Sequence, residues 1–371
     1  MILLNTLAIC LWVKRRMFSF NQLKNIHLEI TNRCQASCPM CSRNIHGGLD
    51  NPLIKNQDWT ISDFKKILSE DVLKHLEGFY FCGNFGDPII NNELIEMCQY
   101  STQVNPNLCI RIHTNGGARN TEWWKKLAKS LPLNHNVIFA IDGLADTHSL
   151  YRIGTNFDKI LENAKAFIHA GGTAEWAFIK FKHNEHQLLA AEALAKEHGF
   201  ARFTYKDSAR FVATEQFPVY DADGNTTRYL EPPTGSKINL ITQNVIDNYK
   251  DVLAASEIDC YVVQTKEIYI DAYKKIMPCC FLAGVPYNYT TVIDVTNNIR
   301  SEIQRQYKEL VNDLGNTNAL EYSIKDIIDS TAWQTVWKKY WHEQKLITCA
   351  RTCGVNKLSK PKDQFIQKVE L

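Results

Sequence analysis

The fold of this 371-residue chain is restricted most by a regular alternation of short β-rich runs and helical patterns between about residues 24 and 212. The ranges expected to form strands are 26–30, 79–81, 109–113, 137–141, 175–181 and 203–205. Amphipathic patterns with helical periodicity fill the intervals, at 62–76, 93–100, 123–131, 157–170 and 185–198. Strands that alternate with helices pair in parallel through right-handed crossovers. The sequence therefore predicts an α/β protein with a parallel sheet and helices outside it, either doubly wound or closed toward a barrel.

Both arrangements place the ligand site at the C-terminal ends of the parallel strands. Three segments rich in reactive or turn-forming residues fall at this position. Residues 34–41 follow the first predicted strand, residues 83–88 the second and residues 114–117 the third. We therefore expect the three segments to lie at one edge of the sheet.

The segment Cys34-Gln-Ala-Ser-Cys38-Pro-Met-Cys41 contains three of the 12 cysteines. Cysteines grouped tightly in a long chain indicate metal ligands, whereas secreted proteins spread theirs as disulfides. Three thiolates in one loop can hold a corner of an iron–sulfur cubane. The loop has no fourth cysteine, so one iron stays open, which is typical of a reactive metal centre. Zinc loops usually carry paired Cys-x2-Cys units, so the spacing favours a cluster over zinc.

From residue 24 to about residue 205 the sequence resembles the radical SAM superfamily, on the CxxxCxxC motif that follows the first strand. The resemblance implies a partial (β/α)6 TIM-like barrel in which Cys34, Cys38 and Cys41 hold a catalytic [4Fe-4S] cluster. It also implies that S-adenosylmethionine (SAM) chelates the fourth iron. Reductive cleavage of SAM would yield a 5′-deoxyadenosyl radical that abstracts hydrogen from the substrate. Met40 stands where relatives usually have an aromatic residue near the adenine, and a methionine can fill such a space.

A glycine-rich segment after the second strand resembles the GGEP segment of that superfamily. In Gly83-Asn-Phe-Gly86-Asp87-Pro88, the glycines allow the backbone to come close to a ligand. Asp87 takes the place of the glutamate, and a carboxylate can accept a hydrogen bond from the SAM ammonium. Outside this context, Gly-Asp-Pro is a common turn.

Four more residues are implied as SAM contacts by the same resemblance. They are Thr114 and Asn115 in the Thr-Asn-Gly turn after the third strand, Asp142 after the fourth strand, and Arg152 in the segment His148-Ser-Leu-Tyr-Arg152. The turn has an equally good structural interpretation as the end of a strand. A lone arginine is usually found at the surface or in a salt bridge.

A second group of cysteines lies near the C-terminus. Cys260 precedes a predicted hairpin at 267–272 and 276–277, Cys279 and Cys280 follow the hairpin, and Cys349 and Cys353 lie far downstream. The arrangement resembles the SPASM or twitch extension of radical SAM enzymes. That resemblance implies an auxiliary [4Fe-4S] cluster held by Cys260, Cys279, Cys349 and Cys353. Zinc remains an alternative, and the choice of Cys279 over Cys280 rests on family spacing.

The predicted organisation has five parts: a tail at 1–21, a radical SAM core at 22–212, a polar connector at 213–255, a SPASM/twitch-like α+β domain at 256–356 and a second tail at 357–371. Residues 1–13 are apolar but too few to span a bilayer. Positive charges follow this stretch, whereas they precede the apolar stretch of a secretory signal. We therefore expect a cytoplasmic protein without a membrane partner.

The formal net charge of +2 at pH 7 gives no strongly basic footprint, so a nucleic-acid partner is not expected. The resemblance implies an oxidoreductase or modifying enzyme that acts on a peptide, a protein side chain or a small molecule. It also implies an electron donor such as flavodoxin or ferredoxin. Two alternatives stay open: a non-catalytic iron–sulfur protein for electron transfer or binding, and an RNA-modifying enzyme of the same superfamily.

Overall fold

The computed structural model describes residues 17–208, 210–211, 216–235, 240–287, 297–355 and 367–370. Its main sheet has nine strands. In spatial order they are β13 (Ile276–Met277), β12 (Glu267–Ile270), β1 (Asn25–Leu28), β4 (Gly78–Phe81), β5 (Cys109–Thr114), β6 (His135–Ala140), β7 (Ala174–Lys180), β8 (Arg202–Asp207) and β15 (Gln367–Glu370). Neighbours from β12 to β8 run parallel. The edge strands β13 and β15 are antiparallel to their neighbours.

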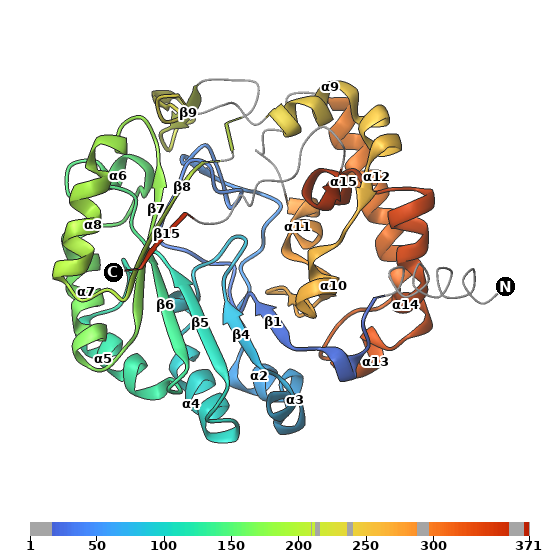
Figure 1. Cartoon of the computed structure of the whole chain (residues 1–371), viewed down its shortest axis with the longest axis horizontal. Coiled ribbons are helices and arrows are strands. Elements are labelled where there is room, and N and C mark those ends of the chain that lie inside the picture. Colours follow the sequence, from blue (N-terminus) through green and yellow to red (C-terminus); the bar gives the residue numbers. More distant parts are fainter. Residues whose placement is uncertain are drawn as a thin grey trace.

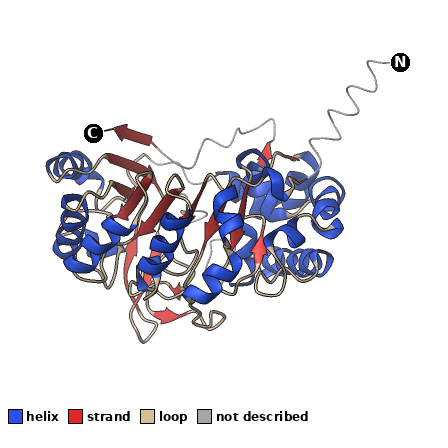
Figure 2. Ribbon diagram, turned by 90° about the horizontal axis from the view of Figure 1, so that it is seen from below, coloured by secondary structure: helices blue, strands red, loops and turns tan. Residues whose placement is uncertain are grey.

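The predicted α/β fold is confirmed. Each of the six predicted strand ranges overlaps one of the strands β1, β4, β5, β6, β7 and β8. The helices that connect them are α2 (Ile61–Ile67), α3 (Glu70–His75), α4 (Leu94–Val104), α5 (Thr121–Ser130), α6 (His148–Tyr151), α7 (Phe157–His169) and α8 (Leu188–Glu197). The helix predicted at 62–76 is divided, because the backbone leaves the helical conformation at Leu68 and Ser69. Helices flank the strands at both ends of the long axis (Figures 1 and 2).

The two faces of the sheet differ in polarity. The outer face packs buried aromatic side chains, such as Phe79 and Phe139, against the helices. The inner face carries a row of polar residues at one register: His27 pairs with Tyr80, and Tyr80 pairs with Arg111. Successive residues of a strand point to opposite faces, so a strand with one apolar and one polar face alternates in its sequence. The sheet therefore encloses a polar concave side.

The C-terminal extension continues the main sheet. Its strand β12 pairs in parallel with β1, from Asn25↔Glu267 to Leu28↔Ile270. The predicted hairpin forms between β12 and β13. The helices of the extension are α9 (Leu240–Ala255), α10 (Tyr261–Thr265), α11 (Cys280–Ala283), α12 (Asn297–Leu314), α13 (Ile324–Ile328), α14 (Thr331–Lys338) and α15 (Ile347–Cys353), with a π-helical turn η6 (Lys339–Glu343) between α14 and α15. A two-stranded ladder joins β11 (Glu257–Ile258) to β14 (Gly354–Val355).

The segment predicted as a connector contains an antiparallel hairpin, β9 (Phe217–Tyr220) and β10 (Thr226–Leu230). A second small hairpin, β2 (Asn44–Ile45) and β3 (Leu49–Asp50), follows the first cysteine group. Single 3-10 turns lie at η1 (Phe20–Gln22), η2 (Pro88–Ile90), η3 (Glu185–Gln187) and η4 (Val285–Tyr287).

Residues 1–16 of the predicted tail at 1–21 and most of the predicted tail at 357–371 lie outside the described residues, although β15 pairs with β8 (Figure 1). Among the helices of the described ranges, none combines the length and apolar character needed to cross a bilayer.

Candidate functional site

The loop after β1 brings Cys34, Cys38 and Cys41 together. A turn bond from Cys41 N to Cys38 O, 2.9 Å long, folds the loop, and Asn44 Nδ2 donates to Cys38 O at 3.3 Å. Cys38 is buried, whereas Cys34 and Cys41 are partly buried. Cys34 and Cys41 pack against the buried cluster that contains Cys38, so the three side chains lie close in space.

Hydrogen-bond donors from neighbouring elements are directed at these sulfur atoms. Asn115 Nδ2 lies 3.5 Å from Cys34 Sγ, and Arg152 Nη1 lies 3.8 Å from Cys38 Sγ. Desolvation by burial raises the pKa of Cys34 and of Cys38, while the Arg152 charge opposes this rise at Cys38. Buried thiols of this kind stay protonated unless a metal displaces the proton. The donors then stabilise the thiolate form, so the loop suits a thiolate-ligated group.

The three thiols are not arranged as a ready site for a single metal ion. Within the described ranges, no three His, Cys, Asp or Glu side chains converge as the ligands of one metal ion do. A zinc ion holds its cysteine ligands at about 2.3 Å and therefore draws them together. In a cubane each iron takes one cysteine, so the thiolates stay further apart.

Asp87 joins two of the predicted segments. Its Oδ2 accepts from Asn115 N at 2.7 Å and from Thr114 Oγ1 at 3.1 Å, and its Oδ1 accepts from Ile89 N at 3.2 Å. The carboxylate is buried, and desolvation raises its pKa. Asp87 thus fixes the turn that carries Asn115 beside Cys34.

Gly83 and Gly86 allow a close approach between two loops. A Cβ on Gly86 would lie 1.9 Å from the carbonyl oxygen of Thr31, at the base of the cysteine loop. A Cβ on Gly83 would lie 2.4 Å from Gly86 O and 2.9 Å from Glu29 Oε1. Only glycine leaves room at such distances. The two glycines therefore allow the 83–88 segment to pack closely against the chain at Glu29 and Thr31.

Asp142 and Arg152 form a buried ion pair beside Cys38. Arg152 Nε lies 2.6 Å from Asp142 Oδ2, and Asp142 Oδ1 accepts from Ile179 N at 2.6 Å. The Asp142 side chain is fully buried and that of Arg152 is 16% exposed. Asn184 donates to Asp142 O at 3.2 Å and so supports the end of the β6 strand. Asp142 thus holds the guanidinium next to Cys38.

Met40 is covered by Ser208, Arg210 and the β9–β10 hairpin, a contact that the sequence did not predict. Its Sδ atom lies 3.6 Å from Ser208 Oγ, and its carbonyl oxygen accepts from Arg210. Met40 and Cys38 pack with Phe217 and Val219 of the β9–β10 hairpin. Tyr220 N donates to His46 O at 2.9 Å. The hairpin therefore shields the cysteine loop on one side.

Sequence reasoning also missed Glu29, which lies one residue beyond β1. Glu29 Oε1 accepts from Phe85 N at 2.8 Å and from Gly86 N at 3.2 Å, and Tyr269 OH donates to Oε2 at 2.5 Å. Burial raises the pKa of Glu29 to about 7. The alternation of His27 and Glu29 with apolar residues over 26–30 is the signal that predicts an inward-facing carboxylate.

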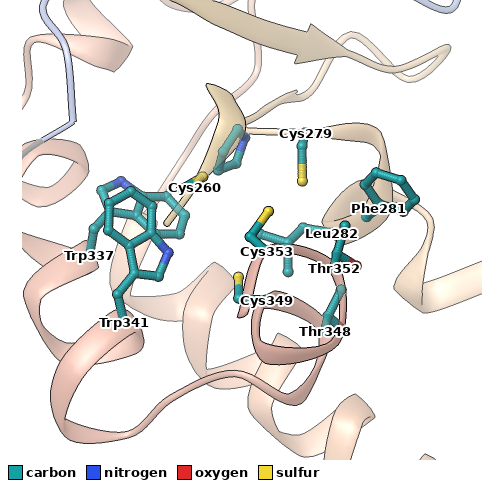
Figure 3. A pocket seen from close by; sticks show the side chains of 11 residues that line it. Cys260, Cys279, Phe281, Leu282, Trp337, Trp341, Thr348, Cys349, Thr352 and Cys353 are labelled. Atoms are coloured by element: carbon teal, nitrogen blue, oxygen red, sulfur yellow. The ribbon is translucent and has the colours of Figure 1, made fainter. Parts of the chain in front are cut away.

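Cys260, Cys279, Cys349 and Cys353 surround one cavity in the extension (Figure 3). The cavity is small, with a volume of about 10 Å³. The neighbouring Cys260 thiol lowers the pKa of Cys353, and burial raises the pKa of Cys279 to about 12.

Cys280 does not line this cavity. Burial raises the pKa of its thiol. The backbone oxygen of Cys280 accepts from Asn84 Nδ2 at 2.8 Å, which ties the 83–88 segment to the extension.

The fold is similar to that of several solved structures. Native anSMEcpe with bound AdoMet and the Cp18Cys peptide matches with a TM-score of 0.50 at 14% identity, over 89% of this chain and 88% of that chain. Native anSMEcpe with AdoMet and the Kp18Cys peptide matches with a TM-score of 0.50 at 13% identity over the same shares. SuiB of Streptococcus suis bound to S-adenosylmethionine gives a TM-score of 0.47 at 13% identity, over 76% of this chain and 68% of that chain.

No family model and no curated protein matches the sequence. At identities this low, the solved structures show the fold alone. The chain has the radical SAM fold.

Proposed function

We propose that this protein is a radical SAM enzyme in which Cys34, Cys38 and Cys41 hold a [4Fe-4S] cluster. The observation that carries the proposal is the pair of donors at the thiols, Asn115 at Cys34 and Arg152 at Cys38. They lie at the C-terminal edge of a parallel sheet of the radical SAM fold, where such sheets bind ligands. When bound, the cluster and SAM supply reductive sulfonium cleavage that begins radical chemistry.

The surrounding residues position this loop. Asp142 holds Arg152 against Cys38, and the cationic guanidinium favours the thiolate that an iron requires. Asp87 holds the backbone of Asn115, whose side chain donates to Cys34. The proposed contacts with SAM are those implied by the resemblance: Met40, Gly83, Gly86, Asp87, Thr114, Asn115, Asp142 and Arg152. The internal bonds of Asp87 and Asp142 favour a positioning role for both carboxylates.

We propose an auxiliary [4Fe-4S] cluster at Cys260, Cys279, Cys349 and Cys353. Four thiols around one cavity supply a complete ligand set. A closed set of this kind serves electron transfer or structure, since it leaves no open iron. The position of Cys280 outside the cavity supports Cys279 as the ligand.

The proposed substrate is a peptide, a protein side chain or a small molecule. The anSMEcpe structure that shares this fold holds the Cp18Cys peptide, which supports a peptide. The polar concave face of the sheet offers a binding surface. His113 on this face is solvent-accessible, yet the protein around it lowers its pKa to about 4 by desolvation. The proposed electron donor is flavodoxin or ferredoxin, and the proposed location is the cytoplasm.

Anaerobic reconstitution tests the proposal. The protein is loaded with iron and sulfide, reduced with dithionite and mixed with SAM, and bound iron and 5′-deoxyadenosine are quantified. About eight irons are expected for two cubane clusters, together with 5′-deoxyadenosine. The triple variant Cys34→Ala/Cys38→Ala/Cys41→Ala is expected to lose about four irons and all product. Cys109→Ala, at the opposite end of β5, is the matched control. Product formation by the triple variant would disprove the assignment.

A further inference from the structure

Two tryptophans lie beside the second group of cysteines. Trp337 of α14 and Trp341 of η6 both line the cavity, as Figure 3 shows. Their rings are 5.2 Å apart at an angle of 31°, and both side chains are buried. The indole Nε1 of each has no hydrogen-bond partner in the described part of the chain. Buried tryptophans usually pair this N–H group, so the absence of a protein partner beside a metal-ligand set requires an explanation.

Trp341 is the better placed of the two. Figure 3 shows the indole nitrogen of Trp341 on the side of the ring that faces the cysteines, whereas the nitrogen of Trp337 lies on the far side of its ring. A protonated thiol is a weak acceptor, whereas a metal-bound thiolate carries negative charge and accepts strongly. An N–H donor near Cys349 is therefore matched to the ligated form of this cysteine.

The backbone around Trp341 supports this assignment. Trp341 lies in the middle of the π-helical turn Lys339–Glu343. Such turns are rare and occur frequently at functional sites, because the extra residue per turn redirects the side chains. The turn directly follows α14 and precedes α15, which carries Cys349 and Cys353. The π-helical turn thus places Trp341 at the cavity, and the following helix α15 contributes Cys349 and Cys353 to the same cavity.

We propose that Trp341 donates its indole N–H to the sulfur of Cys349, or to a cluster sulfide next to it, and thereby raises the reduction potential of the auxiliary cluster. The proposal rests on the proposed cluster at Cys260, Cys279, Cys349 and Cys353. Hydrogen bonds to the sulfurs of a cluster set its potential. The reduced cluster is more negative than the oxidised one, so a donor stabilises the reduced form more and moves the potential to a higher value.

The test compares two tryptophan-to-phenylalanine variants of the full chain. Trp341→Phe removes the donor and keeps an aromatic ring. Trp333→Phe is the matched control, since Trp333 is also buried with an unpaired Nε1 but does not line the cavity. Both are made in the Cys34→Ala/Cys38→Ala/Cys41→Ala background, so that the signal comes from the auxiliary cluster alone.

Iron content and the potential from an EPR-monitored redox titration are measured after reconstitution. We expect unchanged iron content in both variants, a more negative potential for Trp341→Phe and an unchanged potential for Trp333→Phe. Equal potentials in Trp341→Phe and its parent overturn the proposal. If the parent binds no iron at these cysteines, the proposed cluster itself is wrong, which is a separate outcome.

A second measurement keeps Trp341 in place. The tryptophans are labelled with 15N at the indole nitrogen in the Trp337→Phe variant, and electron–nuclear double resonance detects 15N nuclei coupled to the reduced cluster. We expect a coupled 15N nucleus from Trp341. If Trp341→Phe folds poorly, this measurement decides the question, and a spectrum without a coupled 15N nucleus overturns the proposal.

Discussion

The ion pair between Asp142 and Arg152 provides the sharpest test of how the first cysteine group is supported. Asp142→Asn removes the charge but keeps an oxygen for Ile179 N, which Asp142 Oδ1 accepts at 2.6 Å. Arg152 would then be a largely buried cation without its partner, since its side chain is only 16% exposed. Loss of one partner of a buried pair costs about 3–5 kcal/mol of unfolding free energy. A domain has about 5–15 kcal/mol in total, so we expect a strongly weakened but folded protein.

The measurement is urea unfolding of the metal-free protein under reducing, anaerobic conditions, followed by tryptophan fluorescence. Glu122→Gln in the exposed pair of Lys125 and Glu122 is the control, and little change is expected there because both side chains are well solvated. The double variant Asp142→Asn/Arg152→Gln leaves no unpaired charge, so it should be less destabilised than the two single changes added together.

The double variant also separates stability from cluster binding. It lacks the guanidinium 3.8 Å from Cys38 Sγ. We therefore expect it to unfold at a higher urea concentration than Asp142→Asn but to retain less iron at the first site than the unaltered protein. If Asp142→Asn behaves like the exposed-pair control, the ion pair is hydrated and the reasoning is refuted.

Two further predictions concern Glu29 and the adjacent cysteines of the extension. Burial raises the pKa of Glu29 from 4.5 to about 7, so its contribution to stability is fully present below about pH 4.5 and is lost as the pH rises to about 7. This pKa difference corresponds to about 3 kcal/mol. Urea unfolding at pH 5 and pH 7.5 should show a smaller loss for Glu29→Gln than for the unaltered protein, and equal losses would exclude Glu29 as the cause. Cys279→Ala should remove about four irons from the reconstituted protein and Cys280→Ala none; the reverse result would reassign the ligand.

The main elements of the barrel could be predicted because they follow from local patterns. Alternation of apolar runs and helical periodicity located the strands to within a few residues. The break at Leu68 and Ser69 was not visible, since both residues continue a plausible helical face. The β9–β10 hairpin over the cysteine loop was not predicted, because its strands lie in a sequence rich in turn-forming residues. Pro218 in β9 is tolerated because that strand lies at the edge of a two-stranded ladder.

The positions of the candidate site residues were predictable, but their contacts were not. The sequence placed Asp87, Asn115 and Arg152 at strand ends, and parallel strands bring those ends to one edge. Which atom each side chain contacts depends on the distances between loops from different strands. The choice between Cys279 and Cys280 is of the same kind. Their backbones are adjacent, and the packing of α11 against α15 places the Cys279 thiol in the cavity and leaves the Cys280 thiol outside it.

The parallel pairing of β12 with β1 has a consequence for the proposed enzyme. Strand β1 leads directly into the first cysteine loop, and the β12–β13 hairpin leads directly to Cys279. Both cysteine groups are therefore anchored to neighbouring strands of one hydrogen-bonded sheet. Asn84 adds a second link, from the segment that carries Asp87 to the backbone of Cys280. Such a ladder is stiff compared with a flexible linker between domains, so the distance between the two proposed clusters is fixed by the sheet. An electron route between them then requires no domain movement.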